Sequence, residues 1–182
     1  PASTGDNSYV EGDPGSYFTA SFFDDMPDDT LIGKETAPDN GGLTLSALSP
    51  PAASIITSTQ DRIMLAGVAG KPYRIVYSML RGDGEVAQFS DYLFVDLPPD
   101  GGAITALAFL NETLIAFKES AIYAVPGDGF DNAGGGQNYG PARILNSDVG
   151  AVSAEAVELT PKGLIFKSSK GWYLLNHGWQ AG

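Results

Sequence analysis

The chain has 182 residues, a formal net charge of −12 and no cysteine. This length fits one ordinary domain or part of a larger all-β protein, and no apolar run approaches the ~20 residues that a membrane-spanning helix requires, so we expect no membrane partner. The 22 acidic and 10 basic residues argue against direct nucleic-acid contact, because phosphates are bound by clustered Lys and Arg. Without cysteine the chain can form neither a disulfide nor a thiolate metal site, which agrees with a reducing compartment.

The N-terminal part of the chain is acidic and poor in apolar residues. Residues 1–16 are rich in Ser, Thr, Gly, Asp, Asn and Pro, so we expect an irregular acidic segment. An aromatic run at residues 16–23 predicts a short strand, and residues 17–42 are therefore expected to form a short strand and an acidic loop. Nine acidic residues and one lysine precede residue 40, which is typical of a solvated segment, or alternatively of a docking arm.

Residues 43–182 contain about three copies of one pattern, in which short strands of alternating apolar residues are separated by tight polar turns. The clearest copy is residues 102–127. With Ile63, Leu114 and Leu164 as the middle strands, the copies recur near the 40–50 residues typical of β-propeller blades. The missing period of 3.6 residues excludes a helical solenoid.

The predicted fold class is therefore all-β, with antiparallel meander repeats that resemble propeller blades. Three repeats are fewer than the roughly four to eight blades that close a propeller, so we expect the chain to be a segment of a longer polypeptide and part of a larger propeller. Each repeat is a small sheet whose apolar face must be covered by the next one. More of the polypeptide, or neighbouring subunits in a ring, should then cover the end sheets, and the segment alone should aggregate or self-associate.

A Gly- and Asn-rich insertion at residues 127–141 separates the second and third repeats. Such a loop is either disordered or a contact loop, because it becomes ordered only when something packs on it. The candidate contact residues are its polar and aromatic side chains, Asp128, Phe130, Asp131, Asn132, Gln137, Asn138 and Tyr139.

Side chains suited to catalysis are scarce. The single histidine, His177, has no second imidazole in this chain with which to form a clustered metal site, and we expect it on the surface or in a turn. Asp128, Asp131 and Asn132 offer oxygens for calcium, but Phe130 takes the position of the second oxygen ligand of an EF-hand loop. Calcium stays an open alternative; otherwise we predict no cofactor, no metal and no enzymatic activity.

Four aromatic residues on predicted strands, Tyr92, Phe94, Trp172 and Tyr173, are candidates for a sugar-binding platform. On half-buried strands, such side chains are more often part of the core or of the packing between blades. A carbohydrate-binding β-propeller module is therefore the alternative function, and a propeller hydrolase with its catalytic blades outside this segment is a third.

A succession of short motifs runs through residues 40–178, namely DRIMLAG (61–67), VYS (76–78), FSDY (89–92), GGAITAL (101–107), FKESAIY (117–123), GDG (127–129), SDVG (147–150) and KGWYLL (170–175). This order resembles the β-propeller-like structural proteins of tailed bacteriophages, which are tail, nozzle and head-to-tail connector components. The resemblance implies a virion structural protein that is made in the host cytoplasm and located in the phage tail. Its expected partners are other virion proteins in a homo-oligomeric ring, and the family has no catalytic residues to carry over.

Overall fold

The computed structural model describes residues 9–11, 18–20, 45, 47–82 and 84–182, which belong to two compact units, Pro1–Ala37 and Pro38–Gly182. In the first unit, β1 (Tyr9–Glu11) pairs with the antiparallel β2 (Phe18–Ala20). Strand β2 lies within the strand predicted at residues 16–23, whereas β1 lies in the segment predicted to be irregular. The acidic loop and the docking arm fall mainly on residues 21–44, outside the described residues.

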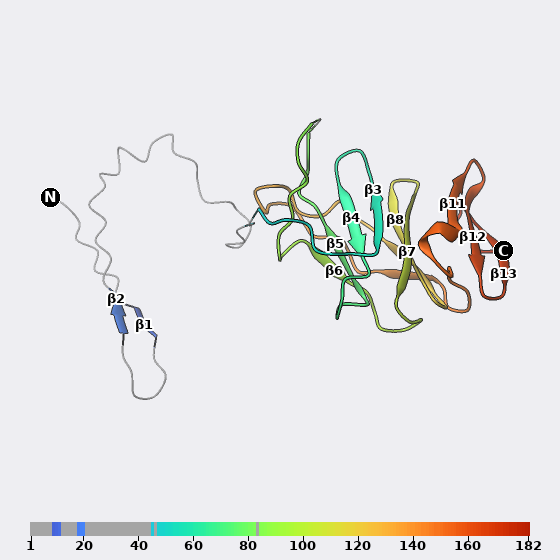
Figure 1. The fold of residues 1–182 in the computed structure, drawn as a ribbon, viewed down its shortest axis with the longest axis horizontal. Coiled ribbons are helices and arrows are strands. Elements are labelled where there is room, and N and C mark those ends of the chain that lie inside the picture. The colour runs from blue at the N-terminus through green and yellow to red at the C-terminus, as the bar shows by residue number, and fades with distance from the viewer. Residues whose placement is uncertain (1–8, 12–17, 21–44, 46, 83) are drawn as a thin grey trace. The chain divides into compact units, whose positions relative to one another are not determined.

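The second unit contains three antiparallel sheets in chain order (Figure 1). The first sheet consists of β3 (Ile55–Ser58), β4 (Ile63–Ala66), β5 (Arg74–Tyr77) and β6 (Phe94–Asp96). The second sheet consists of β7 (Ile104–Leu110), β8 (Thr113–Lys118), β9 (Ile122–Val125) and β10 (Arg143–Asn146). The third sheet consists of β11 (Val157–Thr160), β12 (Gly163–Ser168) and β13 (Gly171–Asn176).

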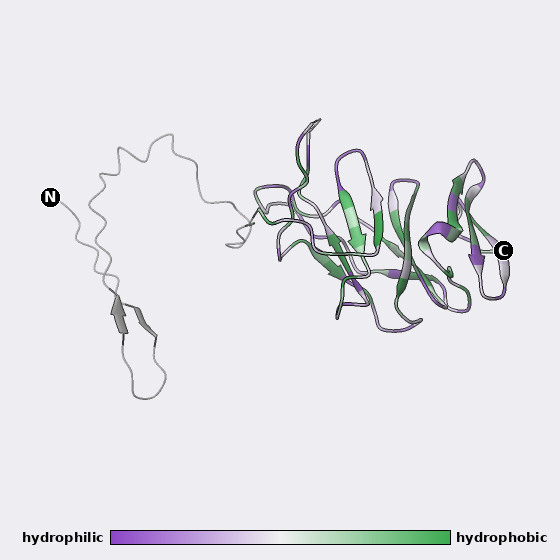
Figure 2. Cartoon of the chain, in the orientation of Figure 1, coloured by the Kyte–Doolittle hydropathy of each residue, from purple (hydrophilic) through white to green (hydrophobic). Residues whose placement is uncertain are grey.

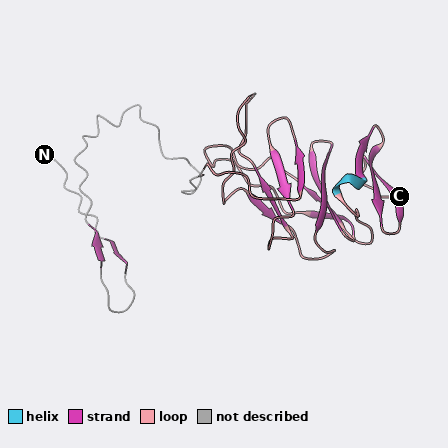
Figure 3. Cartoon of the chain, viewed as in Figure 1, coloured by secondary structure: helices cyan, strands magenta, loops and turns pink. Residues whose placement is uncertain are grey.

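Each of these sheets is a meander, since strands that follow one another in the chain are hydrogen-bonded neighbours. A short 3-10 helix, η2 (Ala154–Ala156), precedes the third sheet and is the one helix drawn among the described residues in Figure 3. The all-β fold class is therefore confirmed, and no helix of the described residues is long and apolar enough to span a membrane. That the sheets are blades of a propeller stays a prediction.

The second sheet is covered on both faces. Successive side chains of a strand point to opposite faces, so a strand covered on both sides is apolar throughout, as in β8 and β9, whose burial is nearly continuous. One face contributes Leu114 and Tyr123 to a core that also contains Ile75, Tyr77 and Val95 of the first sheet. Strand β4 of the first sheet is accordingly hydrophobic along its length (Figure 2).

The opposite face of the second sheet packs on the third sheet. Phe117 and Ile122 share a core with Leu164, Phe166 and Leu175, and the rings of Phe117 and Phe166 lie 5.0 Å apart. At about 1.5–3 kcal/mol for each fully buried large apolar side chain, these two cores hold the three sheets together.

Lys118, at the end of β8, fixes the connection between the first and second sheets. Its side chain is fully buried, and Nζ donates hydrogen bonds to the carbonyl oxygens of Pro98 and, at 3.0 Å, Asp100. The ammonium also lies 4.6 Å from the centre of the Tyr73 ring and 5.5 Å from that of Tyr123. Burial lowers the pKa of Lys118, and the Asp100 carboxylate opposes this shift.

Candidate functional site

The Gly-rich insertion folds back on itself. The Asp131 carboxylate accepts hydrogen bonds from the amides of Ala133 and Gly135, at 2.9 and 2.7 Å, and thereby closes a tight turn. Gly129 has a φ of +77°, and a Cβ there would lie 2.8 Å from the Tyr139 ring and 2.9 Å from that of Tyr77. Only glycine combines this backbone conformation with so close an approach.

The partner on which the insertion packs is the chain's own first sheet. Arg62, which is 3% exposed, donates from its guanidinium to the carbonyl of Ser78 at 2.7 Å and to that of Phe130. The hydroxyl of Tyr77 donates to Oδ1 of Asn138 at 2.7 Å, and the Tyr77 and Tyr139 rings meet edge to face at 5.0 Å. The loop therefore has an intramolecular cause for its order.

Two asparagine side chains of the insertion form hydrogen bonds with main-chain groups outside the insertion. Oδ1 of Asn132 accepts from the Leu80 amide at 2.7 Å, and its Nδ2 donates to the Leu80 carbonyl at 2.8 Å. The Nδ2 of Asn138 donates to the carbonyl of Phe94 at 3.2 Å. These bonds satisfy main-chain groups that would otherwise need water.

The predicted contact residues thus divide into two groups. Phe130, Asn138 and Tyr139 are half-buried against the first sheet. The exposed members are Asp128, Asp131, Asn132 and Gln137. A role in external contacts stays a prediction, and it now rests on the exposed group.

The pKa of Tyr139, which packs between the insertion and the first sheet, depends on its burial and on the charges near it. Burial raises the pKa of Tyr139 to about 12, although the nearby Arg62 guanidinium acts in the opposite direction. The pKa of Tyr77 is also raised by burial. Both hydroxyls therefore stay protonated well above neutral pH.

A groove of about 530 Å³ lies beside the insertion and is lined by turns of the first and second sheets and by Leu159 of β11 in the third. Its lining includes the carboxylate residues Asp61, Glu112 and Asp128, together with Tyr139 and Leu159. No three His, Cys, Asp or Glu side chains converge into a metal-binding group within the described part of the chain. The groove therefore offers hydrogen-bonding and acidic groups, and its geometry does not single out an ion.

His177 lies next to this groove and links three turns. Its Nδ1 is 2.8 Å from Oδ1 of Asn111, and its Nε2 is 3.2 Å from the carbonyl oxygen of Pro161. Asn111 also donates from Nδ2 to the His177 carbonyl at 3.2 Å. His177 is exposed and lies in a turn, as predicted. Its hydrogen bonds connect neighbouring turns and so give it a structural role.

The four aromatic residues considered as a sugar platform are not on one surface. The Tyr173 ring stacks on Phe166 at 5.8 Å inside the second core, and the Phe94 ring lies 3.6 Å beneath the Arg74 guanidinium. Tyr92 and Trp172 are exposed, but Tyr92 precedes β6 of the first sheet and Trp172 lies on β13 of the third. Of the four, Trp172 combines exposure with the apolar side chains of Ile165 and Leu174 on the same face of its sheet.

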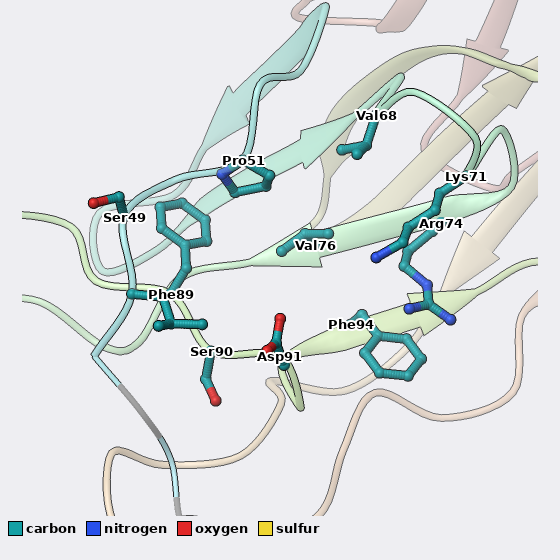
Figure 4. A pocket seen from close by; sticks show the side chains of 11 residues that line it. Ser49, Pro51, Val68, Lys71, Arg74, Val76, Phe89, Ser90, Asp91 and Phe94 are labelled. Atoms are coloured by element: carbon teal, nitrogen blue, oxygen red, sulfur yellow. The ribbon is translucent and has the colours of Figure 1, made fainter.

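The outward face of the first sheet carries a row of directly paired apolar residues, one from each of its four strands, namely Ile56, Leu65, Val76 and Phe94. Beside this row Arg74 and Asp96 form a two-pronged ion pair, with N–O distances of 2.7 and 2.6 Å. A pocket of about 100 Å³, here called the outer pocket, lies over Val76 between Pro51, Phe89 and the turn at Val68 (Figure 4).

Two buried cations, Arg62 and Lys118, were not among the sequence-predicted site residues. Arg62 precedes the apolar residues of DRIML, and Lys118 follows those of LIAFK. A lone basic residue at the end of an apolar run is the sequence signal that could have identified both. No protein-family model matches the chain, and no curated protein is significantly similar to it in sequence.

Proposed function

We propose that this chain is a structural component of a tailed-phage virion, in the tail, nozzle or connector, and that it works through protein–protein contacts in a ring-shaped assembly. The motif succession described above suggests this class of protein. The proposal assigns no catalytic or cofactor-binding residue to the chain, and its partners are other virion proteins.

One observation supports a contact role more strongly than any other. The second sheet has both faces covered by neighbouring sheets, whereas the third sheet turns Trp172, 70% exposed, away from its core. Ile165 is also exposed on the same sheet, and its register partner Leu174 is only half-buried. A sheet face on which a projecting indole lies near exposed aliphatic side chains is typical of a surface that a partner covers.

The experiment for this proposal is mass spectrometry of gradient-purified phage particles that encode the chain. We expect its peptides in intact particles, at a multi-copy ratio to a tail protein of known copy number. Peptides found only in the lysate supernatant, with none in purified particles, would contradict the proposal.

A carbohydrate-binding module is the second candidate, and the exposure of Trp172 is the observation that favours it. The test is a glycan array probed with the chain and with the Trp172→Ala variant. Binding that the substitution abolishes would favour this candidate over a purely structural role, and an array without signal would count against it.

A further inference from the structure

The outward face of the third sheet has a projection. Trp172 pairs directly with Lys167 across β12 and β13, and the Lys167 ammonium lies 5.6 Å from the centre of the indole ring. Ile165 pairs with Leu174 on the same face, because residues paired in register point to the same side of a sheet. The indole is therefore held at its side while most of its surface stays exposed.

The outward face of the first sheet has a recess whose apolar lining suits an aromatic side chain such as that of Trp172. The outer pocket has Val76 and Phe94 in its floor, and Pro51 and Phe89 form an apolar wall (Figure 4). Asp91 and Lys71 stand at its edges as charged residues, and the Arg74 guanidinium lies over the Phe94 ring. An aromatic side chain entering this recess would meet apolar groups at the centre and charged groups at the rim, as in the core and rim of protein interfaces.

The stacking of the sheets within the chain indicates what lies on each outward face. The second sheet packs one face on the first sheet and the other on the third, so two consecutive interfaces repeat the same arrangement. Continuing this arrangement beyond the third sheet requires another sheet of the same kind. The first sheet of a second copy supplies one.

Two pairs of opposite charges can be matched between the two faces, and Arg74 at the outer pocket is already paired with Asp96. Lys167 accompanies Trp172 on the third sheet, and Asp91 lines the outer pocket. Glu158, paired with Ile165 on the third sheet, is opposite in charge to Lys71 at the same pocket. Opposite charges at the rim set the register of an interface more than they add affinity.

We propose that the third sheet of one copy docks on the first sheet of a second copy, head to tail, with Trp172 inserted into the outer pocket. The inference rests on the proposed function, since it names the partner and the surfaces of the ring-shaped assembly. Because the two surfaces differ, the contact is heterologous and propagates from copy to copy until a ring closes.

The test uses sedimentation velocity of the purified 182-residue chain over a concentration series up to about 1 mM. We expect concentration-dependent oligomers. Trp172→Glu on one face and Val76→Glu on the other should each weaken self-association by about 30-fold or more, as for an interface hot spot. Val86→Glu is the matched control, because Val86 is 84% exposed and lies outside both faces.

Mixing the two variants separates this inference from other modes of association. The Trp172→Glu copy retains its pocket and the Val76→Glu copy retains its indole, so an equimolar mixture should form one-to-one dimers and nothing larger. If circular dichroism shows that Val76→Glu is unfolded, Asp91→Lys at the pocket edge takes its place, with the Asp91→Lys/Lys167→Glu double variant expected to recover association.

Three outcomes overturn the inference. A wild-type chain that stays monomeric throughout the series excludes a second copy as the occupant. Loss of association on Trp172→Glu alone, with the pocket variants unaffected, means that the indole faces pair with each other. Loss of association on Val86→Glu means that the two faces are not the contact.

A monomeric chain found in purified particles would refute this inference and leave the proposed function standing, whereas an oligomer absent from particles would refute the proposed function.

Discussion

At the scale of single residues, two buried cations decide how loops are attached to the sheets. Arg62 fixes the Gly-rich insertion and Lys118 fixes the loop at Pro98 and Asp100. Both donate to main-chain carbonyls and lie against tyrosine rings. Because a buried charge is costly unless it is hydrogen-bonded, removing either cation also leaves carbonyl groups without a partner.

Replacing Arg62 by methionine should release the insertion from the first sheet. The variant keeps the apolar stem and loses the hydrogen bonds to Ser78 and Phe130, so we expect the free energy of unfolding to fall by about 2–3 kcal/mol. Amide exchange should accelerate at residues 127–140 more than elsewhere. The matched control is Arg143→Met, at an exposed arginine, which should leave both quantities nearly unchanged. Uniform exchange across the chain in Arg62→Met would contradict the anchoring role.

Tyr139 makes stability depend on pH in the alkaline range. Its pKa is about 12 in the folded protein and ordinarily 10.0, so above pH 10 the unfolded chain releases a proton that the folded chain retains. The stabilisation is therefore complete below pH 10 and is lost as the pH rises toward 12. Urea unfolding at several pH values should show this decline, and Tyr139→Phe should reduce it. Equal declines in both proteins would contradict the assignment.

At the scale of secondary-structure elements, the turns between strands carry the conformational restrictions. The two-residue turn between β7 and β8 has positive φ at both Asn111, 51°, and Glu112, 62°. This geometry matches the twist of a hairpin, and it favours Asn and Gly. Glutamate in the left-handed region is the exception, and its backbone is strained.

Glu112→Gly should relieve this strain and stabilise the protein by about 0.5–1 kcal/mol. Glu119→Gly is the matched control in the turn between β8 and β9, where φ is not positive, and there the extra flexibility of glycine should destabilise the chain. Thermal unfolding of both variants gives the comparison. Changes of the same sign would refute the explanation by backbone strain.

Gly150 marks a close approach between the chain leading to the third sheet and the end of β8. A Cβ at this position would lie 1.8 Å from the carbonyl oxygen of Lys118, which is main chain and cannot move aside. Gly150→Ala should therefore cost more than about 3 kcal/mol or prevent folding, as overpacking does in a dense core. Gly82→Ala, where the nearest atom would be a Glu85 side-chain carbon at 3.4 Å, should be tolerated in the same chemical unfolding assay. Equal losses would contradict the steric argument.

The strands of the three sheets were predictable, because alternation and turn residues are local signals. Ile63, Leu114 and Leu164, expected in middle strands, lie in β4, β8 and β12. The path of the Gly-rich insertion was not predictable. Its order depends on Arg62 and Tyr77, which are 68 and 61 residues away in sequence from their partners Phe130 and Asn138. Composition alone indicates a loop, and only tertiary contacts determine on what it packs.

At the scale of the second unit, the same stacking that buries both faces of the middle sheet leaves each end sheet with an outward face that no other sheet of the described residues covers, although Pro51 and Phe89 lie over part of this face on the first sheet. Exposed apolar side chains on an end face favour the packing of a further sheet, which is the basis of the assembly proposed above. The proposed head-to-tail contact rests on this architecture, whereas the proposed virion role rests mainly on the succession of motifs in the sequence. The acidic net charge of −12 is also in keeping with partners other than nucleic acid.

A reconstruction of the purified particle by electron cryomicroscopy tests the central claim most directly. We predict a ring in which the sheets of each copy are flanked by sheets of its neighbours, with density over Trp172 continuous with the recess above Val76. A particle in which the three sheets are present, but both outward faces are open to solvent, would contradict the account.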